Sequence, residues 1–91
     1  GASRMSRHQF VGELTGETSD WIEIDVKNRF AIGDQLELMT PQGNHSFVLE
    51  ALQDRNGNAI EVAPGNGHSV RIPRPLLADL KYALLMRWLP A

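Results

Sequence analysis

The sequence contains no cysteine, few aromatic residues and no long hydrophobic run. Without cysteine the chain has no thiol nucleophile, no disulfide and no ligands for an iron–sulfur cluster or a cysteine-based zinc site. No apolar segment approaches the roughly 18–20 residues that a membrane-spanning helix requires. The opening residues, G-A-S-R-M-S-R-H, lack the apolar core of a signal peptide. We therefore expect a cytoplasmic protein that contacts no membrane.

A strong excess of either charge is also missing, since the net charge at neutral pH is −2. This disfavours a general nucleic-acid binder, because duplex affinity comes mainly from neutralising phosphates. The distribution is uneven, however. Residues 11–25 carry five acidic side chains and no basic one, whereas residues 67–91 carry four basic side chains and one acidic one. One basic face is therefore compatible with the acidic total, although charges interspersed over a solvated surface are the preferred interpretation.

The chain is long enough for one domain with a small core. It has 91 residues, of which 42% are hydrophobic. A domain of this size buries roughly 60–65% of the surface of its unfolded chain, which leaves little room for a deep catalytic pocket. Gly1 to Ser3 resemble a cloning remnant. We expect a tag remnant or flexible N-terminus over residues 1–7 and a single domain over residues 8–89.

Apolar and polar residues alternate through most of the chain. In D-W-I-E-I-D-V-K, the residues Ile22, Ile24 and Val26 alternate with polar neighbours, which predicts a half-buried strand with one wet face. Further short strands are expected at about residues 9–16, 35–39, 45–52, 59–63 and 68–73.

Turn signals separate these segments at intervals of about eight to twelve residues. They include Gly33-Asp34 and Asn56-Gly57, the second of which is a strong hairpin signal. Gly12, inside the first segment, predicts a bend or bulge. Together the pattern predicts an all-β fold, a small closed or partly open antiparallel β-barrel.

The C-terminal segment, residues 76–88, fits two structures. One face of a helix would carry Leu76, Leu77, Leu80, Leu84 and Trp88. One face of a strand would carry Leu80, Tyr82, Leu84 and Met86. Periodicity alone does not decide between them. Because a barrel needs a last strand to cover its open edge, we favour a turn at Pro75–Asp79 followed by a strand at about Tyr82–Arg87.

Few residues have the spacing that chemistry requires. His8, His45 and His68 show no metal-ligand spacing, so we expect no metal site. Glu23 and Asp25 share one face of a strand, where carboxylates usually serve solubility rather than acid–base catalysis. The glycines of P-G-N-G-H have no Lys-Ser/Thr after them and indicate a turn rather than a phosphate loop. We expect no catalytic residue and no cofactor in this domain.

Basic residues beside an aromatic ring form the most informative polar set. Lys27, Arg29 and Phe30 are close in sequence, and such a combination suits single-stranded RNA, whose bases stack while its phosphates are neutralised. A position inside the core is nevertheless the preferred interpretation for Phe30. The candidate RNA contacts are Lys27, Arg29, Phe30, Arg71, Arg74 and Arg87.

The two tryptophans fit packing and exposed contact equally well. Trp21 alternates out of phase with Ile22 and Ile24, so its ring should point away from the main core. There it could stack on a base or pack against a neighbouring domain. Trp21 and Trp88 are therefore candidate docking residues.

Four segments together resemble the C-terminal domain of the collagenase-like peptidase family U32, in particular its tRNA hydroxylation members. They are F-V-G-E-L-T-G-E, V-K-N-R-F-A-I-G-D-Q-L-E-L-M-T-P-Q-G, V-A-P-G-N-G-H-S-V and Y-A-L-L-M-R. The resemblance runs from about Phe10 to Arg87. Its more specific marks are Asn28-Arg29-Phe30, Gly33-Asp34 and Thr40-Pro41.

The resemblance implies a small barrel, similar to the second domain of elongation factor Tu, that follows a larger N-terminal catalytic part with cysteines associated with an iron–sulfur cluster. Some members are linked to prephenate-dependent hydroxylation of the wobble uridine of certain tRNAs, and others carry protease or collagenase labels. Since this chain lacks the catalytic part, we expect a non-catalytic domain that helps a tRNA-hydroxylating enzyme to bind tRNA. The alternative is a docking module of a collagenase-like protease, which contacts its own catalytic domain or a partner.

Overall fold

The computed structural model describes residues 7–77 and 79–89, and all regular elements of this part are β-strands. The expected tag remnant, residues 1–7, lies outside it except for Arg7. The described part contains no helix that could cross a membrane. The strands are β1 (His8–Glu17), β2 (Trp21–Val26), β3 (Phe30–Ala31), β4 (Gln35–Thr40), β5 (Gly43–Val48), β6 (Gln53–Asp54), β7 (Val62–Ala63), β8 (Ser69–Pro73) and β9 (Leu84–Trp88).

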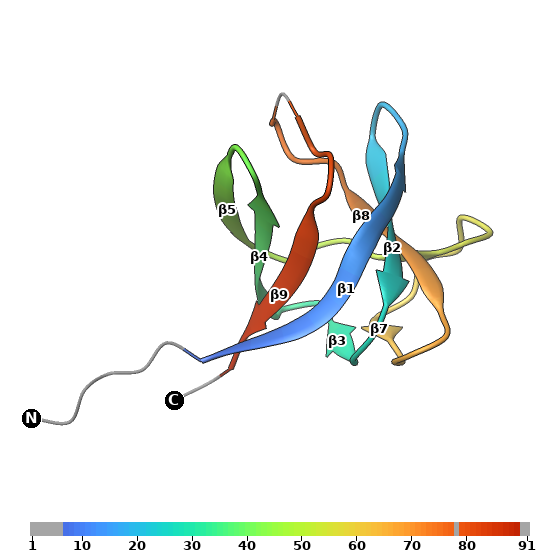
Figure 1. Ribbon diagram of the computed structural model, residues 1–91. Helices are drawn as coiled ribbons and strands as arrows, with labels where there is room; N and C mark the ends of the chain where they lie inside the picture. The colour runs from blue at the N-terminus through green and yellow to red at the C-terminus, as the bar shows by residue number, and fades with distance from the viewer. Residues whose placement is uncertain (1–6, 78, 90–91) are drawn as a thin grey trace, which may run out of the picture.

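Seven strands form one curved antiparallel sheet in the order β5-β4-β9-β1-β2-β8-β6, and β3 pairs with β7 in a second, two-stranded sheet (Figure 1). The edge strands β5 and β6 do not pair with each other, so the barrel is partly open. The predicted all-β antiparallel fold is confirmed.

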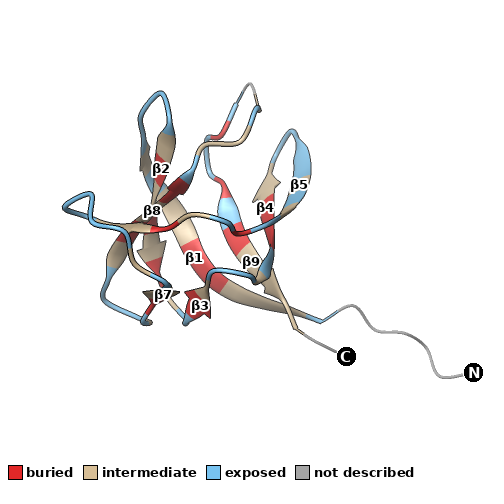
Figure 2. Ribbon diagram, turned by 180° about the vertical axis from the view of Figure 1, so that it is seen from behind, coloured by how far each residue is buried: buried red, intermediate tan, exposed pale blue. Residues whose placement is uncertain are grey.

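The core occupies the concave side of the curved sheet and follows the alternation in the sequence. Ile22, Ile24 and Val26 of β2 are fully buried, while the residues between them are half-buried on the outer face. In β4, Leu36 and Leu38 are also fully buried, but Glu37 between them is buried as well, so the middle of this strand is buried without interruption (Figure 2). The core consists of Val11, Ile22, Ile24, Val26, Phe30, Leu36, Leu38, Leu49, Leu52, Ala63, Val70, Ile72, Leu80, Ala83 and Leu85.

The ambiguous C-terminal segment ends in a strand, so the helix alternative is wrong. Strand β9 begins at Leu84, two residues later than expected, because Tyr82 takes a positive φ of 62° in an exposed turn. The strand also lies between β4 and β1, in the middle of the sheet and not at its edge. The segment expected to turn, Pro75–Asp79, lies within the described residues except for residue 78. In it, Leu77 N–H donates a hydrogen bond to Pro75 O at 2.9 Å.

Strand β1 is long enough to pair with both β9 and β2, and it bends to do so. Its register against β9 shifts between Phe10 and Gly12, and its register against β2 shifts between Leu14 and Gly16. The bulge predicted at Gly12 is therefore confirmed. A bulge bends its strand and increases the local twist, which curves the sheet around the core.

Two of the predicted turns are held by aspartate side chains. At Gly33, which has a φ of 94°, the chain reverses and Asp34 accepts the Ala31 N–H at 2.8 Å. In the Asp54–Asn58 turn the Asp54 carboxylate accepts the N–H groups of residues 56 and 58 at 2.8 and 3.0 Å. These hydrogen bonds lower the pKa of Asp54, because they stabilise its charged form.

Candidate functional site

The five basic residues predicted to contact RNA lie in three separate places. Lys27 and Arg29 are neighbours in the connection between β2 and β3. Arg71 lies on β8 and Arg74 directly after it. Arg87 lies on β9, where it pairs in register with a core residue of β4, near the end of the barrel. The structure therefore does not gather the predicted set into one basic face.

Four of these five basic side chains form ion pairs with carboxylates. Each carboxylate competes with an RNA phosphate for the same cation, which lowers the electrostatic affinity for RNA. The pairs are Lys27 Nζ with Asp25 Oδ2 at 3.0 Å, Arg71 Nε with Glu23 Oε2 at 3.5 Å, Arg87 Nε with Asp34 Oδ2 at 3.0 Å, and Arg74 with Glu17.

The carboxylate of Asp25 also acts on the ionisation of Lys27. Its hydrogen bond to Lys27, together with its negative charge, raises the pKa of Lys27 above the usual value. Lys27 is therefore fully protonated at neutral pH.

Glu23 and Asp25 both take part in ion pairs with basic residues, so this carboxylate pair is not arranged as an acid and a base.

The Asp34–Arg87 pair has a structural role that can be tested. Asp34 Oδ2 accepts hydrogen bonds from Ala31 N–H and from Arg87 Nε–H, and both charged side chains are half-buried. Replacing Asp34 with alanine should lower the free energy of unfolding by about 1–3 kcal/mol, since it leaves a donor and a cation without a partner. Asp34→Asn keeps an acceptor for Ala31 and should cost less. Urea unfolding measures both, and equal stability of Asp34→Ala and the unmodified chain would contradict the assignment.

Arg29 differs from the other predicted contacts. Its side chain is exposed, and within residues 7–77 and 79–89 it forms no ion pair. The surrounding connection is fixed, because Asn28 Nδ2 donates to Phe10 O at 2.7 Å. Val26 N–H donates to His68 O at 2.8 Å, which places exposed His68 close to the same connection. We call Lys27, Arg29 and His68 the basic corner.

Phe30 does not belong to this surface. Its side chain is 0% exposed and pairs in register with Ala63 of β7, so the small β3–β7 sheet carries it into the core. A base cannot stack on a ring that is enclosed by core side chains. Phe30 is therefore removed from the candidate RNA contacts, and the preferred interpretation as a core residue holds.

The two tryptophans lie on different parts of the outer surface. Trp21 begins β2 and pairs in register with Pro73 of β8. Trp88 ends β9, and its ring centroid is 3.9 Å from that of His8, with an interplanar angle of 50°. Since β1 separates β9 from β2 in the sheet, Trp21 and Trp88 do not form one contiguous docking surface.

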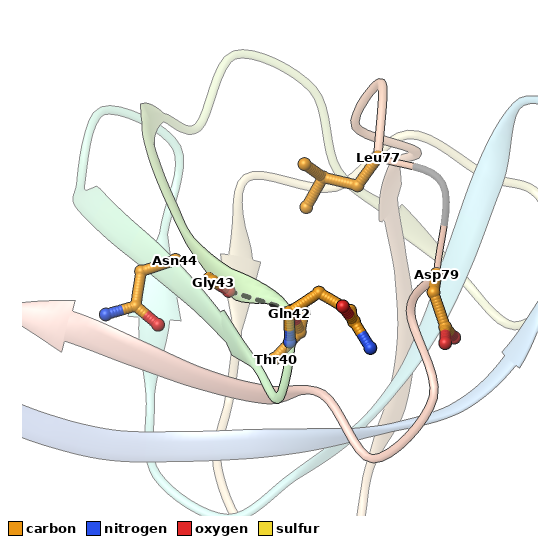
Figure 3. A pocket seen from close by; sticks show the side chains of 6 residues that line it. All are labelled: Thr40, Gln42, Gly43, Asn44, Leu77 and Asp79. Atoms are coloured by element: carbon orange, nitrogen blue, oxygen red, sulfur yellow. Dashed lines mark hydrogen bonds between the residues drawn. The ribbon is translucent and has the colours of Figure 1, made fainter.

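A hollow of about 280 Å³ lies between the β4–β5 turn and the connection that precedes β9 (Figure 3). Its lining residues are Thr40, Gln42, Gly43, Asn44, Leu77 and Asp79. The Thr40 hydroxyl donates to Gly43 O at 2.8 Å and accepts the Gln42 N–H at 3.1 Å, so it is used to hold the turn. Asp79 is the one ionisable residue in this lining, and general acid–base chemistry would need a second group beside it.

The three histidines lie apart. His8 Nε2 is 2.9 Å from Glu37 Oε1, the His45 ring stacks on Phe47, and His68 Nδ1 is 3.2 Å from Gly65 O. No group of three or more potential metal ligands occurs among the described residues. The burial of Glu37 was not expected, because L-E-L alternation indicates a wet outer position.

Comparison with known proteins shows which family and which curated proteins this chain is similar to. The model of the Peptidase family U32 C-terminal domain matches residues 6–87. The tRNA hydroxylation protein P of Escherichia coli (strain K12) is 52% identical over 88 residues, and that of Haemophilus influenzae (strain ATCC 51907 / DSM 11121 / KW20 / Rd) is 45% identical over 89 residues. Each alignment covers 96% of this chain and 19% of the relative. The chain thus spans about a fifth of the length of these curated relatives.

Two solved structures have the same fold. Both are of the C-terminal domain of a Geobacillus thermoleovorans protein assigned to the U32 peptidases, and one is its selenomethionine variant. Their TM-scores are 0.76 and 0.74 at 21% and 22% identity. The first comparison covers 94% of this chain and 98% of the other, and the variant covers 85% and 96%. From the match along almost its whole length, the chain belongs to the peptidase family U32 C-terminal domains.

Proposed function

We propose that this chain is the C-terminal barrel of a tRNA hydroxylation protein and that it helps to bind tRNA without taking part in the chemistry. The observation that carries the proposal is the 52% identity to the E. coli tRNA hydroxylation protein P over 96% of the chain. The reaction that we propose for the whole protein is the wobble-uridine hydroxylation implied by the sequence resemblance. Any iron–sulfur cluster of that protein would be held by cysteines outside this domain, since this chain contains none.

The basic corner is the part of the surface that best suits a tRNA phosphate. Arg29 presents an exposed guanidinium whose planar fork matches phosphate oxygens, and it has no carboxylate partner in the described part of the chain. Lys27 adds a second cation, which is only partly neutralised by half-buried Asp25. With so few free cations, the domain should contribute one or two phosphate contacts to tRNA binding rather than hold tRNA alone.

Replacing Arg29 with alanine should weaken tRNA binding by the isolated domain roughly three- to tenfold at low salt. One lost phosphate contact should also reduce the slope of log affinity against log salt by about 1. Fluorescence anisotropy of labelled tRNA across a salt series measures both quantities. Arg7→Ala is the matched control, because Arg7 is equally an exposed arginine without an ion pair in the described part of the chain but lies before β1, where its O accepts the Leu89 N–H.

The outcomes separate a specific RNA contact at the basic corner from diffuse electrostatic attraction. A loss confined to Arg29→Ala supports the basic corner as an RNA contact. Equal loss in both variants indicates diffuse attraction to a polyanion. If the unmodified domain shows no tRNA binding even at low salt, the proposed RNA role is wrong.

A further inference from the structure

The outer surface of the barrel has two halves of different chemistry. On β2 and β8 the middle of the outer face is charged, and Glu23 pairs with Arg71 there, while Trp21 and Pro73 lie at one end. On β9 the outward side chains are apolar. Leu85 is fully buried on the inner face, so alternation places Leu84 and Met86 on the outer face.

Strand pairing extends the apolar half from β9 onto both neighbouring strands, although Glu13 lies opposite Leu84 and Glu37 opposite Met86. Met39 of β4 pairs in register with Leu84, and Phe10 of β1 pairs with Met86. Trp88 continues the row along β9. We call Phe10, Met39, Leu84, Met86 and Trp88 the apolar stripe. Figure 1 shows β4, β9 and β1 side by side with no other described element in front of them.

The stripe is accessible, and a contiguous apolar area of this kind marks an interaction site more often than chance. Leu84 is 41% exposed, and the other four members are half-buried. A solvated outer strand normally carries polar residues at such positions, as β2 does at Glu23 and Asp25.

Of the two carboxylates beside the stripe, the more deeply buried one already has a partner. Glu37 lies beside Met86 in register, and its side chain is only 11% exposed. Its Oε1 is 2.9 Å from Nε2 of His8, whose ring packs against Trp88. Glu37 would therefore keep its partner when the stripe is covered, whereas Glu13, which pairs in register with Leu84 on β1, would have to remain in contact with solvent at the edge of the interface.

The family and the position of the first strand indicate what covers the stripe. The chain spans 19% of the length of its tRNA hydroxylation relatives and matches a C-terminal domain, so the larger part of such a protein comes before it. A preceding segment would enter at His8, the first residue of β1, which pairs with Trp88 at one end of the stripe. A tethered neighbour attached there has a high effective concentration at this surface.

We propose that the apolar stripe docks this barrel onto the larger preceding part of a protein of the kind that these relatives represent. The basic corner is next to this surface, because Asn28, between Lys27 and Arg29, donates to Phe10 O, but none of its three residues belongs to the stripe. Interfaces between domains of one chain typically bury about 600–1,500 Å². The barrel would then have a fixed position relative to the rest of the protein.

The test uses a full-length protein in which this chain replaces the C-terminal fifth of the E. coli relative. Leu84→Glu introduces a charge in the stripe. Ile32→Glu is the matched control, because Ile32 is 40% exposed against 41% for Leu84 but lies between β3 and β4. Limited proteolysis at the junction and small-angle X-ray scattering report whether the two parts stay together. We expect at least tenfold faster cleavage and a larger radius of gyration for Leu84→Glu, and neither change for Ile32→Glu.

Three controls fix the meaning of the result. Thermal unfolding of the isolated domain must show that the Leu84→Glu variant folds. If this variant does not fold, Leu84→Gln is used in its place. Unchanged cleavage and scattering in the folded stripe variant would overturn the proposal. So would dimerisation of the isolated domain that Leu84→Glu abolishes, because the stripe would then join two copies. Arg29-dependent tRNA affinity should be the same in Leu84→Glu, which separates failure of docking from failure of the RNA role.

Discussion

Replacing Phe30 with alanine should lower the free energy of unfolding by about 3–5 kcal/mol. The ring is 0% exposed and is the largest fully buried side chain of the core. Its removal deletes apolar contacts and leaves a cavity in the core. The strand that carries the ring, β3, has only two residues and is too short to shift inward and fill that cavity. Since small domains are stable by only about 5–15 kcal/mol, this single change should remove a large part of the stability.

Thermal unfolding followed by circular dichroism measures the effect. A loss of this size should lower the Tm by roughly 15–30 °C in a domain of about 90 residues. Phe30→Leu is the matched control, because it keeps most of the apolar volume and should cost much less. If Phe30→Ala unfolded like the unmodified chain and lost only tRNA affinity, the ring would be a surface contact and its placement in the core would be wrong.

The alternation of residues was enough to predict the fold class and much of the core. Ile22, Ile24 and Val26 are apolar at every second position, and a strand with one buried face is the simplest structure that satisfies this pattern. The C-terminal segment was ambiguous for a physical reason, since its leucines satisfy both periods. Its strand is fixed by pairing with β1 and β4, and such distant partners leave no mark on the local sequence.

The surface was harder to predict because ion pairs depend on register. Glu23 and Arg71 are opposite each other on β2 and β8, and Asp34 and Arg87 are 53 residues apart in the chain. A sequence shows that a residue is basic but not which carboxylate lies beside it. Arg29 was therefore indistinguishable from its paired neighbour Lys27 before their partners were known.

The burial of Glu37 has the same origin. Its alternation with Leu36 and Leu38 correctly places it on the outer face of β4. Its burial comes from Met86 and His8 on β9 and β1, which lie next to it only after the sheet has formed. The apolar stripe could likewise be recognised only after β9 was placed in the middle of the sheet.

Replacing Gly12 with alanine should lower the free energy of unfolding by about 3 kcal/mol, at the upper end of the usual cost of overpacking a core. A Cβ atom at this position would lie 2.5 Å from Ile24 Cγ2 and 2.8 Å from Asp25 O. The second contact is with backbone, so relief requires β2 to move away from β1. Gly12 is also at the bulge where β1 pairs with β9 and β2 at once, and movement of β2 would strain both pairings.

Gly16→Ala is the matched control for this prediction. Gly16 lies on the same strand at the second register shift, but its added Cβ would meet the Glu23 carboxylate at 3.2 Å, and that flexible side chain can turn aside. We therefore expect a change within about 1 kcal/mol for Gly16→Ala. Chemical denaturation of the two variants, measured side by side, isolates the cost of the backbone contact. If Gly12→Ala were as stable as Gly16→Ala, the close approach of β1 and β2 would not be what requires glycine at position 12, and the bend of β1 would need another cause.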